Sequence, residues 1–134
     1  MTGARFFVDR GVGSRIVPEG LRAIGWHVVT MDERYGKHAS QGISDADWIR
    51  DASTHDDTIL TKDRAIAKRA LEAEAIMSNS ARVLVIGSAN ITGAESLERL
   101  IRHRRRIERL IAEPGPFVWA VGRDRLDPVR LRGA

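Results

Sequence analysis

Three aspartates stand at points where the sequence changes from one kind of element to the next. Asp9 and Asp63 each follow a short β-type run, and Asp45 opens a helical segment. In an open parallel sheet, ligands bind outside the carboxyl ends of the strands, and the helices of right-handed crossovers begin at that same edge. We therefore expect the three carboxylates to converge at one edge of a sheet.

Converging carboxylates repel one another, and a divalent cation is the usual compensation. Two like charges 4 Å apart cost about 4 kcal/mol at an effective dielectric constant of 20. Ligation by oxygen atoms alone suits Mg²⁺ or Mn²⁺. Such an ion binds a phosphodiester, lowers the pKa of a water molecule and stabilises the leaving oxygen. The three acids therefore indicate the chemistry of a metal-dependent nuclease.

Helical spacing distinguishes Asp45 from its neighbour Asp47. The apolar stripe of this helix consists of Trp48, Ile49 and Ala52. Asp45 lies three and four positions before Trp48 and Ile49, and it therefore shares their face. Asp47 lies on the polar side. We expect Asp45 to point into the site, with Asp47 as the alternative or as a helper that acts through a hydrogen bond or a water molecule.

Each acid also has a simpler structural interpretation. Ser44 and Asp47 have the spacing of a capping box, and Asp63 could cap the helix that it precedes. Asp9 could cap the first helix or pair with Arg10. Caps do not require three acids at the same edge of a sheet, so their common position favours the metal site.

Short β-type runs alternate with helical segments along the chain. The β-type runs cover residues 5–9, 26–31, 58–61, 81–86 and 117–121. The helical segments cover residues 14–24, 44–55, 64–77 and 95–112, and residues 32–42 read as a polar loop. This alternation predicts an α/β fold with a central, mainly parallel sheet of four to five strands and helices on both faces.

Length and composition are those of one globular domain. The chain has 134 residues, of which 43% are hydrophobic and 30% charged, so we expect a single domain over residues 1–134. Its core would span about residues 5–121, followed by a basic tail at 122–134. No apolar stretch is long enough for a membrane helix. The chain contains no cysteine, which fits a reducing cytoplasm.

Basic residues surround the acids and line one predicted helix. Arg10 follows Asp9, and Lys62 and Arg64 flank Asp63, so these cations are candidates to hold a phosphate. On the long helix, cations recur at spacings of three and four and form a basic stripe, thickened by two neighbours. The stripe consists of Arg99, Arg102, Arg106 and Arg109, with His103 and Arg105 beside it.

This stripe has three interpretations that the sequence leaves open. The stripe can bind the phosphates of a nucleic acid, it can contact a protein partner, or it can simply face solvent. The net charge of +4 permits a nucleic-acid partner without requiring one. In the polar loop, Tyr35 could stack on a base, although a lone loop tyrosine is more often packed against the protein.

Three segments, in this order, resemble the PIN-like nuclease domains, and most closely those of VapC-type toxins from toxin–antitoxin pairs. They are Phe-Val-Asp-Arg-Gly-Val-Gly at residues 7–13, Ser-Asp-Ala-Asp-Trp at 44–48, and Ile-Leu-Thr-Lys-Asp-Arg at 59–64. The segment Pro-Gly-Pro-Phe-Val at 114–118 also fits. The resemblance spans about residues 5–121.

The resemblance implies a three-layer α/β/α fold and cleavage of RNA that depends on Mg²⁺ or Mn²⁺. The acids of the family match Asp9, Asp45 (or Asp47) and Asp63. Many PIN domains carry a fourth acid after the next strand, and this chain has neutral residues there. These are Ser88, Asn90 and Thr92, before the first acid at Glu95. A second metal site is therefore doubtful.

We expect a cytoplasmic endoribonuclease in which the aspartates hold the cation and basic residues bind the RNA. The candidates for RNA binding are Lys62, Arg10, Arg64, Arg102 and Arg106. A toxin implies a cognate antitoxin partner, and apolar helix surface suggests a homodimer. One alternative is a catalytically decayed PIN-like module that binds RNA or protein. A haloacid-dehalogenase-type phosphatase is disfavoured, because that class needs Asp-x-Asp and Asp9 is followed by Arg10 and Gly11.

Overall fold

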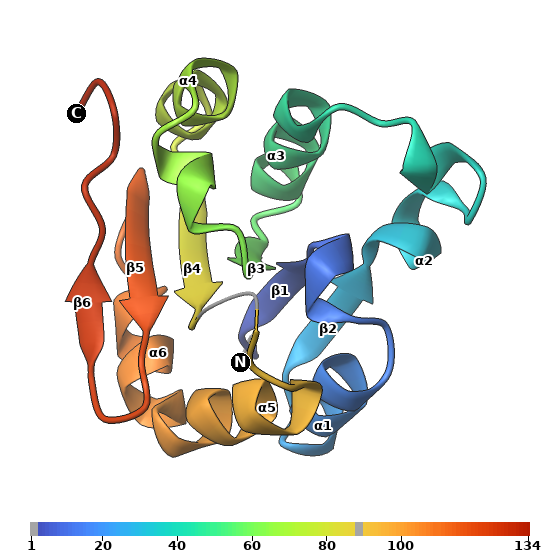
Figure 1. Ribbon diagram of the computed structural model, residues 1–134, viewed down its shortest axis with the longest axis vertical. Helices are drawn as coiled ribbons and strands as arrows, with labels where there is room; N and C mark the ends of the chain where they lie inside the picture. Colours follow the sequence, from blue (N-terminus) through green and yellow to red (C-terminus); the bar gives the residue numbers. More distant parts are fainter. Residues whose placement is uncertain (1–2, 88–89) are drawn as a thin grey trace.

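The computed structural model describes residues 3–87 and 90–134. Its centre is a six-stranded sheet (Figure 1). The strands are β1 (Arg5–Val8), β2 (His27–Thr30), β3 (Thr58–Thr61), β4 (Arg82–Ile86), β5 (Phe117–Val121) and β6 (Leu126–Pro128). Their order across the sheet is β2-β1-β3-β4-β5-β6, and the pairs from β2 to β5 are parallel.

The sixth strand comes from the segment that was expected to form a basic tail. β6 pairs antiparallel with β5, so that Trp119 faces Pro128 and Val121 faces Leu126. Beyond it, Val129 is buried and its amide donates to the carbonyl of Val118 at 2.8 Å. The sheet therefore has one strand more than the upper end of the expected four to five. A three-residue edge strand that contains proline gives almost no pattern in the sequence.

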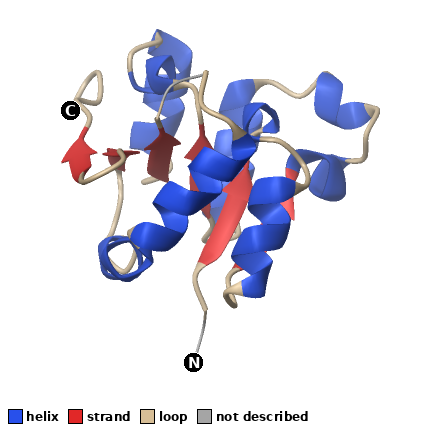
Figure 2. Cartoon of the chain, turned by 60° about the horizontal axis from the view of Figure 1, so that its bottom comes forward, coloured by secondary structure: helices blue, strands red, loops and turns tan. Residues whose placement is uncertain are grey.

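Helices cover both faces of the sheet, which makes three layers (Figures 1 and 2). They are α1 (Ile16–Ala23), α2 (Met31–Tyr35), α3 (Asp45–Thr54), α4 (Ala70–Ser78), α5 (Gly93–Arg102) and α6 (Arg104–Leu110), with 3-10 turns η1 (Arg10–Val12), η2 (Ala39–Gln41) and η3 (Arg64–Ala67). In Figure 1, α3 and α4 lie on one face, and α1, α5 and α6 on the other. The α/β/α architecture expected from the alternation is confirmed.

The sheet separates two hydrophobic clusters. Phe7 points to one face and stacks on Trp48 of α3, with ring centroids 5.5 Å apart. Phe6 points to the other face and stacks on Trp26, with centroids 4.5 Å apart. Adjacent strand residues point to opposite faces, so the apolar run of β1 contributes to both clusters. β1 is thus packed on both faces of the sheet, which positions the loop that leaves its carboxyl end.

The long helix expected over residues 95–112 is two helices, α5 and α6, which meet at His103. His103 is buried, and its Nε2 lies 3.1 Å from the carbonyl oxygen of Gly122 and 3.2 Å from that of Arg123. His103 therefore does not belong to an exposed basic stripe. The chain bends there because an imidazole binds the β5–β6 turn, a contact that helical periodicity does not reveal.

Residues 32–42, expected to form a loop, contain α2 and η2. Thr30 caps α2: its hydroxyl accepts from the Glu33 amide at 3.1 Å, and the Glu33 carboxylate accepts from the Thr30 amide at 2.9 Å. This capping box explains how a five-residue helix forms in a polar stretch. Among the residues described, no helix is both long and apolar enough to cross a membrane.

Candidate active site

The site lies where the sheet changes its direction of winding. β1 and β3 are neighbours, but the chain leaves β1 toward β2 and leaves β3 toward β4, so the two connections diverge. Ligands of doubly wound sheets bind at such a point, outside the carboxyl ends of the strands. Asp9 follows β1 and Asp63 comes two positions after β3. The Asp9 amide donates to the carbonyl of Leu60 at 2.9 Å, which fixes the two strand ends together.

Thr61, the last residue of β3, connects the two acids directly. Its buried hydroxyl donates to Oδ2 of Asp9 at 2.8 Å. The hydroxyl oxygen of Thr61 also accepts a hydrogen bond from the backbone amide of Asp63 at 3.0 Å. One Asp9 oxygen is therefore oriented by the protein. Thr61 was not among the site residues expected from the sequence, although a threonine two positions before an acid at a strand end was a detectable signal.

Asp9 is the acid whose pKa the fold perturbs. Burial, together with the charges of Asp45 and Asp63, raises the pKa of Asp9 above its ordinary value of 3.8, against the opposing hydrogen bonds from Thr61 and the Arg10 amide. Burial is the largest cause. Asp45 and Asp63 lie near enough to Asp9 for their charges to contribute to this shift.

Asp45 and Asp47 occupy different faces of α3. Asp45 accepts from the indole nitrogen of the buried Trp48, with Oδ1 at 2.9 Å. Asp47 instead pairs with Arg50, with Oδ1 3.3 Å from Nη1, on the exposed side. The amide of Asp47 is capped by the Ser44 hydroxyl at 3.1 Å. The Ser44 cap thus coexists with a half-exposed Asp45, which is the acid of the two whose charge acts on Asp9.

Asp63 faces an arginine of the same chain. Its carboxylate forms an ion pair with the guanidinium of Arg69, and it also caps η3 by accepting from the Ala65 amide at 3.1 Å. Nη2 of Arg69 lies 3.9 Å from Oδ2 of Asp45. Within residues 3–87 and 90–134, no three acidic or histidine side chains lie close enough together to hold one metal ion as they stand.

The donor set nevertheless fits a hard divalent cation. Three carboxylates from β1, α3 and the end of β3 offer oxygen ligands, which Mg²⁺ and Mn²⁺ prefer. Burial, and to a smaller extent the charges of Asp45 and Asp63, raises the pKa of Asp9, and a positive charge beside it would act in the opposite direction. The side chains of Asp45 and Asp63 are 49% and 41% exposed, so rotation about their side-chain bonds is open to them. Arg69 already places one positive charge beside Asp63 and Asp45.

A hollow opens along the carboxyl ends of β3, β4 and β5, and it is lined by the two chain neighbours of Asp63 rather than by the three acids themselves. Its volume is about 490 Å³, and Lys62 and Arg64 line it together with Gly87, Gly122 and Asp127. A second hollow of about 500 Å³ lies at the opposite edge, among the first residues of β1, β3 and β4. Ligand sites of parallel sheets lie at the carboxyl edge, so the hollow beside Asp63 is the one suited to a substrate.

Comparison with known proteins agrees with this geometry. The family model described as "PIN like domain" matches residues 4–88, which include Asp9, Asp45 and Asp63. This chain belongs to the PIN-like domain family. A protein of Mycobacterium tuberculosis (strain ATCC 25618 / H37Rv), named "Putative ribonuclease VapC45", is 33% identical over 115 residues, which cover 86% of this chain and 83% of the relative. The resemblance seen in the sequence is confirmed. No solved structure gave a significant match.

In this PIN-like domain the position after β4 holds no acid among the described residues. Thr92 and Glu95 form the capping box of α5, in which the Thr92 hydroxyl accepts from the Glu95 amide at 3.1 Å. Asn90 is exposed, and Ser88 lies outside the described residues. Arg99 reaches this edge instead: its Nη1 lies 2.5 Å from where a Cβ of Gly87 would be. Arg99 therefore points to the carboxyl edge of β4 rather than along an outer stripe.

The other basic candidates occupy several distinct places on the domain. Lys62 donates to the carbonyl of Ile91 at 2.8 Å, which ties the β4–α5 loop to the site. Arg10 donates to the carbonyl of Ser40. Arg102 donates to the carbonyl of Arg123 at 3.2 Å and pairs with Glu98 and Asp124. Arg106 lines a separate hollow of about 290 Å³ with Arg109, Leu110, Trp119 and Leu126. The predicted stripe is thus divided among three surfaces.

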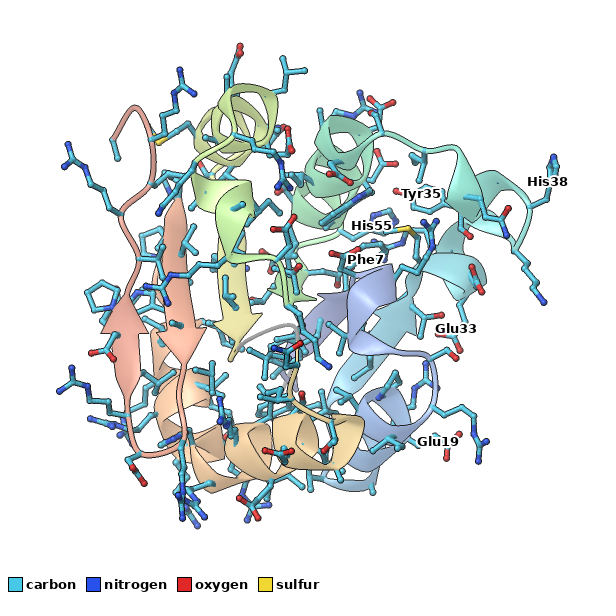
Figure 3. All side chains as sticks on the ribbon, in the orientation of Figure 1. Phe7, Glu19, Glu33, Tyr35, His38 and His55 are labelled. Atoms are coloured by element: carbon cyan, nitrogen blue, oxygen red, sulfur yellow. The ribbon has the colours of Figure 1, made fainter. Side chains whose placement is uncertain are left out.

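Tyr35 is partly buried and packs against the protein. Its hydroxyl donates to Oδ2 of Asp51 at 2.7 Å, and its ring lies edge-on to Phe7 at 6.4 Å. Burial and Asp51 together raise the pKa of Tyr35 above its usual range. Figure 3 shows Tyr35 turned toward α3, while His38 points outward from the same segment. The packed interpretation of Tyr35 is the one that the structure bears out.

Proposed function

We propose that this PIN-like domain is an endoribonuclease that depends on Mg²⁺ or Mn²⁺. One observation carries the proposal: Asp9 and Asp63 stand at the divergence of β1 and β3 and are joined through Thr61, and the guanidinium of Arg69 reaches both Asp63 and Asp45. The relative named as a ribonuclease supports RNA as the substrate. Hydrolysis of a phosphodiester is the reaction that such an oxygen-rich site serves best.

Asp9, Asp45 and Asp63 are the residues that would hold the cation. When bound, it would supply a Lewis acid for the phosphate and lower the pKa of the attacking water. Thr61 keeps Oδ2 of Asp9 oriented. Asp47, bound to Arg50 on the exposed side of α3, remains the alternative to Asp45.

The basic residues bind and orient the RNA. Lys62 and Arg64 line the hollow beside Asp63 and are placed to hold phosphates next to the cleaved bond. Arg10, next to Asp9, would contact the other side. Arg102 and Arg106 would contact RNA that extends beyond the hollow toward α6. Backbone contacts of this kind position a nucleic acid without reading its sequence.

The toxin role rests on the VapC name of the relative. We propose that this protein acts in the cytoplasm and that a cognate antitoxin restrains it. A homodimer is a further proposal. Two large hydrophobic side chains are well exposed among the described residues, Ile16 of α1 and Leu71 of α4. They lie in opposite layers of the domain (Figure 1), so each would belong to a different interface.

The decisive experiment is RNA cleavage by purified protein with Mn²⁺ and with EDTA. Wild type is compared with Asp9→Asn and Asp63→Asn, which remove one carboxylate each and keep its shape. Asp56→Asn is the matched control, because Asp56 pairs with Arg82 at the opposite edge of the sheet. Asp56 has φ 61°, a conformation that asparagine also tolerates.

We expect metal-dependent cleavage by wild type and Asp56→Asn, and none by the two active-site variants. Activity that survives in EDTA or in both variants would contradict the proposed mechanism. Binding of RNA without cleavage, unchanged by Asp9→Asn, would instead support a catalytically decayed module. The neutral residues after β4 are the feature that favours a catalytically decayed module.

A further inference from the structure

Arg69 is the residue that neutralises the acidic cluster in the folded chain. Its two terminal nitrogens reach both carboxylate oxygens of Asp63, one contact being Nη1 to Oδ1 at 3.5 Å. Nη2 also lies 3.9 Å from Oδ2 of Asp45. One guanidinium therefore spans two of the three acids that the proposed function assigns to the cation. Neither sequence motifs nor the family match single out Arg69.

The position of Arg69 is fixed by the surrounding structure. Its backbone joins η3 to α4, because its amide donates to the carbonyl of Ala65 at 3.0 Å and its carbonyl accepts from the Ala73 amide at 2.8 Å. Nε pairs with Glu72 in the first turn of α4, and only 13% of the Glu72 side chain is exposed. Glu72 thus binds the Nε side of the Arg69 guanidinium, and the two terminal nitrogens of Arg69 remain directed at the acids.

We propose that Arg69 is a built-in counter-ion which a divalent cation must displace from Asp63 and Asp45. This inference rests on the proposed function, because it assumes that these acids bind the cation. A carboxylate oxygen that is bound to a guanidinium is not free to coordinate a metal. Arg69 therefore lowers the affinity of the site for a metal ion. In the metal-free protein, its positive charge also offsets the repulsion between the carboxylates.

Coulomb's law gives the direction and the size of the effect. The positive charge of Arg69 repels a dication a few Å away and also competes for its ligands. Both effects weaken metal binding, and solvent and salt reduce them at this partly exposed site. Replacing Arg69 by a neutral residue is therefore expected to tighten Mn²⁺ binding by about tenfold.

The test is a titration of the intact protein with Mn²⁺ alone. Binding is measured by isothermal titration calorimetry and, independently, by the electron paramagnetic resonance signal of free Mn²⁺. Arg69→Gln removes the charge, whereas Arg69→Lys retains it. Arg50→Gln is the matched control, because it removes a charge that pairs with Asp47 and Asp51 on the outer face of the neighbouring helix. We expect the dissociation constant to fall about tenfold in Arg69→Gln and to change less than about threefold in the other two.

Two further readouts separate this role from a purely structural one. The difference in Mn²⁺ affinity between wild type and Arg69→Gln is expected to shrink at high salt, because it is electrostatic. In EDTA, Arg69→Gln is expected to melt below wild type, and saturating Mn²⁺ is expected to raise its melting temperature by more than that of wild type. Arg69→Lys shows whether a loss of folding, rather than of charge, explains the result.

The outcomes distinguish this inference from the proposed function. If wild type binds Mn²⁺ and Arg69→Gln binds it equally or more weakly, the counter-ion role is wrong and the metal site stands. If neither wild type nor Arg69→Gln binds Mn²⁺, both proposals are wrong. Tighter binding in Arg69→Gln that is abolished by adding Asp63→Asn would support both.

Discussion

The hydroxyl of Thr61 donates a 2.8 Å hydrogen bond to Oδ2 of Asp9, across the β1–β3 pair. Thr61 is fully buried, and its oxygen also accepts from the amide of Asp63. A single hydroxyl thus orients one acid and the backbone of another. The arrangement opposes the effect of burial on Asp9, because the hydrogen bond lowers the pKa that burial raises.

Replacing Thr61 with valine should remove the hydrogen bond to Asp9 that lowers its pKa, and it should keep the shape of the side chain. We expect the free energy of unfolding to fall by about 1 kcal/mol, as is typical for one lost hydrogen bond. The pKa of Asp9 should rise further, so the acid limb of the pH profile of RNA cleavage should move to higher pH. Thr58→Val, at the other end of β3, is the control. An unchanged acid limb in Thr61→Val would show that the hydrogen bond does not tune Asp9.

Asp9→Asn should stabilise the metal-free protein at neutral pH. The pKa of Asp9 is raised in the folded state, so the folded protein binds this proton more tightly than the unfolded chain does. The free energy of unfolding of wild type therefore decreases as the pH rises from about 3.8 through the folded-state pKa, and the loss is complete above it. Asparagine carries no such penalty and can still accept from Thr61.

Thermal unfolding in EDTA between pH 3 and pH 8 tests this. The melting temperature of Asp9→Asn should exceed that of wild type at pH 7, and the two should approach each other at the acid end. Saturating Mn²⁺ should stabilise wild type more than the variant, because a ligand stabilises the state that binds it. A variant that melts below wild type at pH 7 in EDTA would show that Asp9 carries no electrostatic penalty.

Changing Asp45 to asparagine should weaken Mn²⁺ binding far more than changing Asp47 to asparagine. Asp45→Asn can still accept from Trp48, so the helix should remain in place while a charged ligand is lost. We expect its Mn²⁺ affinity to fall by at least about tenfold, and that of Asp47→Asn to change less than about twofold. Isothermal titration measures both. The reverse order would move the ligand to Asp47.

Tyr35→Phe should affect stability and leave RNA binding unchanged. The variant loses the hydrogen bond to Asp51 at 2.7 Å, which should lower the free energy of unfolding by about 1 kcal/mol. Urea unfolding measures the loss, and fluorescence anisotropy with labelled RNA measures the affinity. If the affinity fell more than about threefold while folding stayed intact, Tyr35 would stack on a base after all.

Arg64→Gln should weaken RNA binding through one lost phosphate contact. The slope of log affinity against log salt should become shallower by about one unit. Arg22→Gln provides the control. Arg22 lies near the carboxyl end of α1, just before β2, and its side chain pairs with Glu33. Equal slopes for wild type and Arg64→Gln would place the RNA away from the hollow beside Asp63.

Much of the fold and the positions of the acids followed from local patterns. Short apolar runs alternating with amphipathic segments predict parallel strands and crossover helices, and acids after the first and third runs must then share an edge. The face of α3 followed in the same way, because Asp45 precedes Trp48 and Ile49 by one helical turn. Such inferences succeed because they depend only on the period of the backbone and on the handedness of its connections.

The sequence could not reveal the contacts between distant side chains. Arg69 faces Asp63 and Asp45 because η3 and α4 turn it back onto α3, and His103 ends α5 because the β5–β6 turn lies beneath it. The basic stripe divides for the same reason. Each of these features depends on which segments meet in space, and no local period encodes that.

The sequence by itself therefore determined the layers, the sheet edge and the three acids placed there. Only the tertiary structure decided that Thr61 orients Asp9 and that Arg69 pairs with Asp63 and lies near Asp45. The physical reason is that backbone periodicity is a local property of the chain. Charge neutralisation and the burial of a polar group are instead settled by neighbours brought together only on folding.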